Sequence, residues 1–420
     1  MAANFYPPQL NPFLVRLAQS IAPVAIRSFY QFELAVSSEC LEQIRALKHQ
    51  RLLLLPNHPT FQDPIVLFAL SALRETFYYL AADELFNSSL SGVFQRLGVY
   101  SIRRGLVDRP SIAQTLALLT QPDCRLVIFP EGGCSFQNDV VMPFRVGAVQ
   151  IAFQALSKLV KQGEPLPNLY VLPVSIKYRY TQDMSQAIAQ MLSQLEQALN
   201  LISTSSPYQR LRAVAEQVLV KVEQDYELDN SENDRQSWEQ RISQLRISIL
   251  KSCEQQLGIA SNPKELVRER TYRIKHMLKL KADALESDPA KAELDILEGK
   301  QDSNLKLIEK SVKRLLNFDA IYDGYVAENP TSERFIDTLI RLEREVFDID
   351  QPPPKGYRRV RIKTGEPVNL KDGFADYQRD GRCANRRRHR TQAVNSVTLK
   401  IQQSVQDNLN LLQDEAEWTR

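Results

Sequence analysis

The chain has 420 residues, of which 43% are hydrophobic and 25% are charged. These shares are typical of globular proteins and exclude a disordered, collagen-like or purely coiled-coil chain. The 53 basic and 50 acidic residues leave a formal net charge of +3, so bulk charge indicates no nucleic-acid partner. The five cysteines form neither a CxxC pair nor a metal-binding spacing with histidine, which favours reduced, intracellular thiols and no metal site.

The N-terminal part, residues 1–44, is predicted to be an amphipathic helical segment. Within it, residues 9–30 place seven apolar side chains at helical spacing with few charges: Leu10, Phe13, Leu14, Leu17, Ile21, Val24 and Ile26. Two interpretations stay open, a helix packed on the core and a helix lying in a membrane interface. No apolar run approaches the ~18 residues of a membrane-spanning helix, and no cleavable signal is expected.

Three short apolar runs predict buried strands. They read RLLLLPNH at 51–58, RLVIFPEG at 125–132 and LYVLPVSIKY at 169–178, and each ends in a polar or turn cluster. Such runs suit strands covered on both faces, and the helical patterns at 111–120 and 146–161 separate them. The predicted fold class is therefore α/β, with a central mixed sheet flanked by helices.

Residues 181–355 are predicted to be all-helical. Only three of the 14 glycines fall there, whereas six lie between 92 and 147, where the backbone is expected to turn sharply or approach a ligand. Four prolines follow cap-type residues, which is a helix-start signature: Ser206-Pro207, Asn262-Pro263, Asp288-Pro289 and Asn329-Pro330. After the proline-rich linker at 351–355, residues 357–367 predict a half-exposed or edge strand, and 391–416 a last amphipathic helix.

A histidine and a carboxylate follow the first predicted strand. His58 lies just past the strand, and Asp63 comes five residues later. The carboxylate of such an HX4D pair can hold one imidazole nitrogen in its tautomer, while the other nitrogen accepts a proton. Alone, this spacing is weak, and a surface histidine in a loop is the simpler interpretation.

Three further blocks accompany this pair in chain order: LGVYSIRRG at 97–105, FPEGGCS at 129–135 followed by PFRVGA at 143–148, and VLPV at 171–174. With NHPTFQD at 57–63, they resemble the glycerolipid acyltransferases of the 1-acylglycerol-3-phosphate acyltransferase type. That family shows NHxxxxD, a G-x-x-[FY]-x-x-R block, FPEG-[TS] and a V-P-V strand. All four blocks have a counterpart here.

The resemblance implies transfer of an acyl chain from acyl-CoA or acyl-carrier protein to the hydroxyl of a lysophosphatidate-like lipid, in phospholipid biosynthesis. His58 would be the general base acting directly on that hydroxyl, with Asp63 fixing its tautomer, so no acyl-enzyme intermediate is expected. The resemblance assigns acceptor binding to Glu131 and Gly132, and phosphate binding to Arg104 and Arg145. The acyl donor is a co-substrate, and no cofactor is implied.

Several of these roles have simpler alternatives. Arg103 and Arg104 suit a solvated pair, Glu131 suits an ordinary turn carboxylate, and Arg145 stands where the family often has lysine. Cys134 departs from the family, which frequently has arginine there, and this leaves the acceptor open. A nucleophilic Cys134 is a weak interpretation, because no second histidine lies near it in sequence.

The family resemblance also divides the chain. Its members commonly have a later strand ending in G-E-P, as at 365–367, followed by a closing helix. The core would then comprise 45–180 and 356–420, with 181–355 as an insertion; the alternative is a separate C-terminal domain.

A lipid acceptor implies a protein peripheral to a membrane, on its cytoplasmic side. The arginine-rich residues 381–390 suit a solvated face or a site for anionic lipid headgroups, and a nucleic-acid partner is not expected. Two other functions stay open: an acyltransferase for another lysolipid or hydroxylated lipid, and a non-catalytic lipid-binding scaffold on the same fold.

Overall fold

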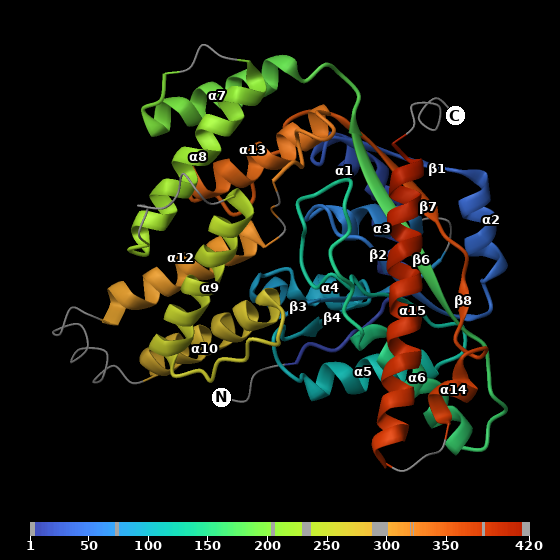
Figure 1. The fold of residues 1–420 in the computed structure, drawn as a ribbon. Helices are drawn as coiled ribbons and strands as arrows, with labels where there is room; N and C mark the ends of the chain where they lie inside the picture. Colours follow the sequence, from blue (N-terminus) through green and yellow to red (C-terminus); the bar gives the residue numbers. More distant parts are fainter. Residues whose placement is uncertain are drawn as a thin grey trace. The chain divides into compact units, whose positions relative to one another are not determined.

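The computed structural model describes residues 5–71, 75–202, 206–228, 237–287, 301–319, 321, 323–379 and 383–413 (Figure 1). The chain forms two compact units. The first comprises the described residues within Met1–Ile102, Asp108–Gln182 and Gly356–Arg420, and the second those within Arg103–Val107 and Asp183–Lys355. We describe each unit by itself.

An eight-stranded sheet forms the centre of the first unit. Its strands are β1 (Phe32–Val36), β2 (Arg51–Pro56), β3 (Tyr78–Ala82), β4 (Val99–Ile102), β5 (Arg125–Val127), β6 (Leu169–Tyr180), β7 (Arg358–Thr364) and β8 (Val368–Asn369). They lie in the order β1-β7-β6-β2-β5-β3-β4, with β8 paired to β6. All pairs are parallel except those of β6 with β7 and with β8. The predicted α/β fold class is confirmed.

Helices cover both faces of this sheet (Figure 1). They are α1 (Pro12–Ser28), α2 (Ser38–Ala46), α3 (Asp63–Ser71), the short 3-10 helix η1 (Asp83–Asn87), α4 (Ser91–Arg96), α5 (Arg109–Thr120), α6 (Gly147–Lys161), α14 (Phe374–Gln378) and α15 (Cys383–Leu411). Successive side chains of a strand point to opposite faces. Leu53 and Leu55 of β2 therefore pack with α5, α6 and α15, and Leu52 and Leu54 pack with α1, α2 and α3. Burial on both faces explains the continuous apolar run.

The N-terminal segment differs from the helical prediction for residues 1–44. Between α1 and α2 it forms β1, which pairs in parallel with β7 from Phe32↔Arg358 to Val36↔Ile362. Phe32 is fully buried. The helical pattern at 9–30 does correspond to α1, but the short strand after it is stabilised by a partner more than three hundred residues away in sequence, which local periodicity does not reveal.

The strand β7 is not an edge strand, because β1 lies on one side of it and β6 on the other. Its charged residues find partners on the neighbouring strands, as Arg359 does in an ion pair of 2.5 Å with Glu33 of β1. Strands β6 and β7 pair from Val174↔Thr364 to Tyr180↔Arg358, although residues 181–357 separate them in the chain. The chain therefore returns to the sheet beside the point where it left.

The described residues of the second unit form helices joined by turns and loops. Its long helices are α7 (Ser185–Leu199), α8 (Pro207–Asp225), α9 (Trp238–Leu257), α10 (Val267–Ser287), α12 (Gln301–Phe318) and α13 (Ser332–Phe347). Ser206 caps α8 in a capping box, as its proline signature predicts. Two other signatures are displaced, since Thr331 caps α13 and α10 begins only at Val267. The fourth, Asp288-Pro289, lies outside the described residues.

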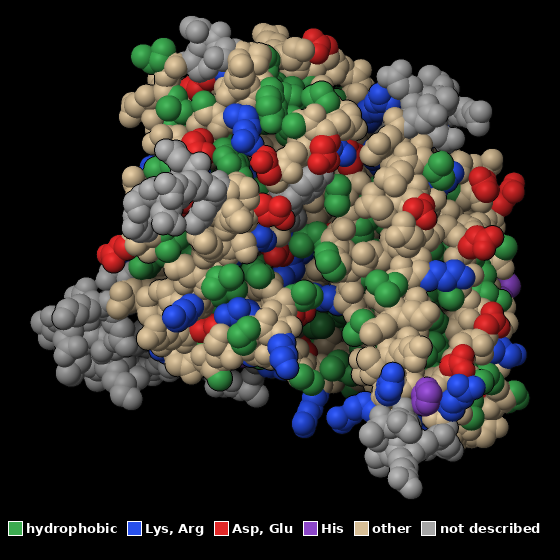
Figure 2. Space-filling view, viewed as in Figure 1, with side chains coloured by type: hydrophobic (Ala, Val, Ile, Leu, Met, Phe, Trp, Pro, Cys, Tyr) green, Lys and Arg blue, Asp and Glu red, His purple; other side chains and the backbone are tan. Residues whose placement is uncertain are grey.

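The surface agrees with the small net charge. Hydrophobic, basic and acidic side chains are interspersed over the described residues of the face in Figure 2. Among the described helices, none combines the length and the hydropathy needed to cross a bilayer.

Candidate active site

Asn57 positions His58 at the carboxyl end of β2. The Asn57 side chain behaves like a further residue of the sheet: its Nδ2 donates to the carbonyl of Ile176 at 3.0 Å, and its Oδ1 accepts from the Ile176 N–H at 2.7 Å. Because both bonds go to the neighbouring strand β6, they fix the direction in which the chain leaves β2. His58 follows directly and is half-buried.

His58 and Asp63 form the pair that their spacing predicts. The distance from His58 Nδ1 to Asp63 Oδ2 is 2.7 Å. Asp63 is fully buried at the start of α3. Three other groups donate to it: the Thr60 N–H at 2.9 Å, the Thr60 hydroxyl at 2.9 Å and the Tyr178 hydroxyl at 2.6 Å. A carboxylate held in this way keeps the proton of a neutral imidazole on Nδ1 and leaves Nε2 as the acceptor.

Glu131 braces the backbone of the site. It is 2% exposed, and its Oε1 accepts from the His58 N–H at 2.7 Å, while its Oε2 accepts from the Met142 N–H at 3.3 Å. The resemblance implied that this carboxylate binds the acceptor. In the structure both oxygens hold the loops that follow β2 and β5.

Gly132 and Arg145 lie together beside this brace. Gly132 has φ +74°, in the left-handed region, and a Cβ there would run into the guanidinium of Arg145. The Arg145 N–H donates to the Pro130 carbonyl at 2.9 Å, so the strand-end turn holds this residue by its backbone as well. Glycine is needed here for two reasons, the backbone conformation and the closeness of the arginine.

Cys134 lies against the imidazole of His58. Its Sγ is 3.5 Å from Nε2 and 3.8 Å from Nδ1. The sequence distance between the two residues concealed this contact, since it depends on β2 and β5 being parallel neighbours whose carboxyl ends meet. The Phe129 ring stacks on the imidazole, with 4.2 Å between ring centroids.

These neighbours change the proton affinity of the site. Burial by itself lowers the pKa of His58, but the adjacent Cys134 and Asp63 raise it more strongly, so the pKa lies well above its ordinary value. Burial and the Asp63 carboxylate also raise the pKa of Tyr178 well above its ordinary value. Tyr178 therefore keeps its proton and donates it to Asp63 in a hydrogen bond.

The closing helix α15 supports the loop that contains Cys134 and Arg145. Gln402 accepts from the Phe144 N–H at 2.8 Å, and Gln406 accepts from the Val141 N–H at 3.0 Å and donates to the Asp139 carbonyl at 2.9 Å. Sequence reasoning missed these glutamines, Thr60 and Tyr178. Polar residues on a helix or strand show no pattern that assigns them to a distant loop.

Arg104 belongs to the other unit, unlike the five remaining predicted site residues. Its Nη1 donates to the Tyr272 hydroxyl at 2.7 Å, and its guanidinium carbon lies 4.2 Å from the centroid of the Tyr272 ring. Gly105 beside it has φ +77° and packs against the backbone of α10. Arg104 is thus held on a helix of its own unit by a hydrogen bond and a cation–π contact.

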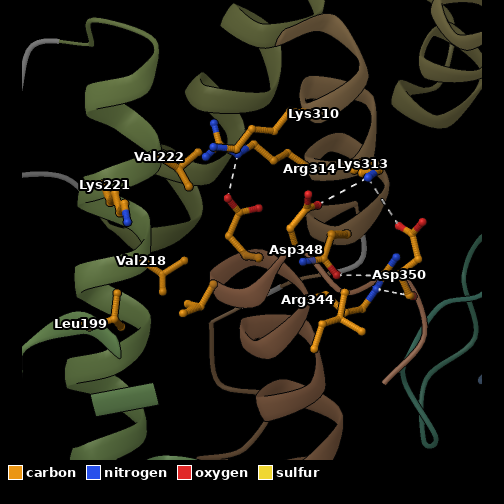
Figure 3. A pocket seen from close by; sticks show the side chains of 14 residues that line it. Leu199, Val218, Lys221, Val222, Lys310, Lys313, Arg314, Arg344, Asp348 and Asp350 are labelled. Carbon is orange, nitrogen blue, oxygen red and sulfur yellow. Dashed lines mark hydrogen bonds and ion pairs between the residues drawn. The ribbon is translucent and has the colours of Figure 1, made fainter. Parts of the chain in front are cut away.

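The helical unit also contains a cavity of about 250 Å³ (Figure 3). Its lining includes several ion pairs: Arg314 with Glu345 at 2.7 Å, and Lys313 with Asp348 at 3.4 Å and Asp350 at 4.0 Å. No histidine or cysteine is among the described lining residues. In the described ranges, no group of three or more His, Cys, Asp or Glu is placed to hold a metal ion.

The fold and the His58–Asp63 pair define an α/β protein with an oriented imidazole at the carboxyl end of β2. Residues 36–177 match the family model described as Acyltransferase, that of the glycerolipid acyltransferases. This segment includes all six predicted site residues as well as Cys134, and it ends within β6. The match supports acyl transfer as the activity. No curated protein matches the chain.

Proposed function

We propose that the protein transfers an acyl chain from acyl-CoA or acyl-carrier protein to the hydroxyl of a lysophosphatidate-like glycerolipid, as a step of phospholipid biosynthesis. The observation that best supports this is the bond of 2.7 Å between His58 Nδ1 and the buried Asp63 carboxylate, inside the segment that matches the acyltransferases. Activating an alcohol requires a base with one nitrogen oriented and the other available to a proton.

In this proposal His58 takes the proton of the acceptor hydroxyl through Nε2. The phosphate of the acceptor binds Arg145, whose guanidinium lies over the Gly132 turn close to the histidine loop. Arginine suits this role because its planar fork can make two hydrogen bonds to a phosphate. We assign Arg104 a phosphate-binding role as well. Acyl transfer to lysophosphatidate by a variant substituted at Arg104 alone tests that role independently of Arg145.

Acyl transfer from acyl-CoA and from acyl-carrier protein to lysophosphatidate tests the proposal. We expect His58→Ala to lose activity by roughly 10²–10⁴-fold, the usual contribution of a general base. The matched control is His49→Ala, because His49 is an exposed histidine nine residues before His58. Unchanged turnover in His58→Ala would remove the proposed base.

A second acceptor deserves a test because Cys134 stands where the family frequently has arginine. A cysteine provides no charge for a phosphate, and here its sulfur contacts His58 instead. A panel of lysolipids and hydroxylated lipids separates the candidates. Acylation of another acceptor together with failure on lysophosphatidate would decide against the first choice.

We propose that the protein works at the cytoplasmic surface of a membrane through α1. One row of this helix, Val15, Gln19, Ala22 and Ile26, is buried in its own unit, whereas a second apolar row is exposed. That second row includes Phe13 at 79% and Val24 at 67% exposure. The helix has two arginines and no acidic residue, which suits an anionic lipid surface.

Flotation with vesicles of anionic and zwitterionic lipid measures this docking. We expect the double variant Phe13→Asp/Val24→Asp to lose binding to anionic vesicles. Leu399→Asp on α15 is the matched control, since Leu399 is also an apolar residue at 62% exposure on a helix of the same unit. Equal binding by the double variant and the control would contradict docking through α1.

A further inference from the structure

The Asp63 carboxylate binds a second side chain besides His58, the phenol of Tyr178, and a cation lies against that phenol. We propose that Tyr178 and Arg358 are positioning residues, which limit the negative charge that the Asp63 carboxylate presents to the imidazole and thereby set the basicity of the proposed base. This inference rests on the proposed acyltransferase function. Both residues lie outside the segment 36–177 that matches the family.

Tyr178 binds the carboxylate oxygen that does not contact His58. Its hydroxyl donates to Asp63 Oδ1 at 2.6 Å, whereas the imidazole lies 2.7 Å from Oδ2. Asp63 is fully buried and Tyr178 is 3% exposed, so solvent screens this hydrogen bond little. A donor to the charged carboxylate stabilises its charge. The Tyr178 hydroxyl therefore weakens the attraction of Asp63 for a second proton on His58.

The position of the phenol does not depend on Asp63 alone. Asn138 binds the backbone of Tyr178 through two bonds: its Nδ2 donates to the carbonyl at 2.7 Å, and its Oδ1 accepts from the N–H at 2.8 Å. Asn57 binds Ile176 of the same strand in the same way. The ring also packs edge-on against Phe32, with 6.4 Å between centroids. Loss of the hydroxyl alone, in Tyr178→Phe, therefore leaves these contacts of the ring and backbone in place.

Arg358 brings a positive charge to the phenol. Its guanidinium carbon lies over the Tyr178 ring, 4.9 Å from the centroid, and its Nη2 donates to Oε1 of Gln62 beside Asp63. Among the residues that the structure describes, no acidic side chain forms an ion pair with Arg358. Burial and the Asp63 carboxylate raise the pKa of Tyr178, and the Arg358 charge opposes them. The phenol thus keeps its proton, and the cation makes it a stronger donor.

The pairing of β6 with β7 brings these two residues together. Tyr178 lies opposite Val360, and Tyr180 lies opposite Arg358. Side chains two residues apart on a strand share a face, so Tyr178 and Arg358 are diagonal neighbours on one face of the sheet, within reach of a long side chain. Residues 181–357 separate the two strands in the chain. Arg358 therefore reaches the phenol only when the chain has returned to the sheet.

A base beside a buried carboxylate benefits from such a limit. Burial lowers the pKa of His58, but Cys134 and Asp63 raise it more strongly. A base whose pKa lies far above the working pH stays protonated and cannot accept the proton of a hydroxyl. The other charged or titratable side chains that contact this pair or its phenol come from three elements: Glu131 and Cys134 from the loop after β5, Tyr178 from β6 and Arg358 from β7.

Titration of the His58 ring by NMR in the full-length protein, without substrate, tests this inference. We expect the pKa of His58 to be higher in Tyr178→Phe than in wild type, because the Asp63 charge is then less stabilised and attracts the imidazolium more strongly. The matched control is Tyr100→Phe, since Tyr100 is another buried tyrosine of the sheet, whose hydroxyl lies 2.7 Å from that of Thr115. We expect this control to titrate like wild type.

Substitution of Arg358 tests the role of the cation. Arg358→Gln removes the charge and should raise the pKa of His58 by less than Tyr178→Phe does, whereas Arg358→Lys should titrate close to wild type. The matched control is Arg359→Gln, which removes the same charge from the next residue of β7, on the opposite face.

Acyl transfer provides a second measurement on the same variants. Tyr178→Phe and Arg358→Gln should lose about 3- to 10-fold in kcat/KM on the acidic limb, where the deprotonated fraction of His58 decides the rate. On the plateau they should change by less than about 3-fold.

A merely structural role predicts the opposite sign, because a loosened Asp63 would stabilise the imidazolium less. A pKa of His58 at or below the wild-type value in a folded Tyr178→Phe would therefore overturn the inference. Equal titration of Arg358→Gln and Arg359→Gln would overturn the role of Arg358. Circular dichroism verifies folding, and if Tyr178→Phe does not fold, the Arg358 variants decide. Failure of the proposed function would look different, since the wild-type protein would then acylate no acceptor.

Discussion

The backbone N–H of His58 donates to Oε1 of Glu131 at 2.7 Å, which joins the turns that follow two adjacent strands. One carboxylate from the FPEG block thereby holds the backbone of His58 in the NHxxxxD block. The Ser135 N–H, which donates to the His58 carbonyl at 2.8 Å, joins the same two blocks a second time.

Glu131→Gln tests whether this carboxylate braces the loops or binds the acceptor. The amide keeps the size but presents an NH2 group to one of two backbone donors, so we expect a loss of about 1–3 kcal/mol in the free energy of unfolding. We also expect a lower kcat with little change in the acceptor KM. Denaturant unfolding and steady-state kinetics measure these effects. An increased acceptor KM with unchanged stability would instead indicate direct binding.

Asp63→Asn should disable His58 with little change in its position. The asparagine amide cannot accept from all four groups that now donate to Asp63, and the histidine loses the charge that fixes its tautomer. We expect kcat to fall by roughly 10²–10⁴-fold. Asp372→Asn, at an exposed position of the same unit, is the control. Activity of Asp63→Asn within a few-fold of wild type would contradict this role.

The raised pKa of His58 predicts how both the activity and the folding stability depend on pH. The protonated form cannot act as base, so the acidic limb of kcat/KM should lie above the ordinary histidine pKa of about 6.5. The folded state also binds this proton more tightly than the unfolded state. The resulting stability is fully present below about pH 6.5 and is lost as the pH rises through the folded pKa.

Titration of the His58 ring by NMR measures this pKa directly. Cys134→Ala and Asp63→Asn each remove a group that raises it, while the effect of burial remains, so both variants should titrate at lower pH than wild type. The exposed His49 serves as the internal reference in every spectrum. A wild-type His58 that titrates at or below about 6.5 would rule out the predicted shift.

Gly132→Ala should destabilise the site through both backbone strain and steric overlap. Its φ of +74° disfavours any side chain, and the new Cβ would overlap the Arg145 guanidinium. We expect a loss of about 1–3 kcal/mol in unfolding experiments. Gly163→Ala separates the two causes, since Gly163 has φ +86° with no atom within 4 Å of a Cβ. Equal losses in both variants would show that Arg145 contributes nothing.

Much of the first unit can be predicted from sequence because its signals are local. The leucine run of β2 is buried on both faces, and the helix α6 after β5 shows its apolar spacing. The five-residue interval between His58 and Asp63 lies within one loop and the first residue of α3, so their pairing also follows from neighbours in the chain. The strand β1 escaped prediction because its stability depends on β7.

The sequence alone determined the fold class, the His58–Asp63 pair and the resemblance to acyltransferases, since each depends on residue types at short, regular spacing. Only the tertiary structure decided that Cys134 contacts Nε2 of that histidine and that Tyr178 donates to Asp63. The same holds for the support that α15 gives to the loop between Cys134 and Arg145. These contacts join residues from separate strands and helices. Their proximity results from the order of strands in the sheet, which no local pattern records.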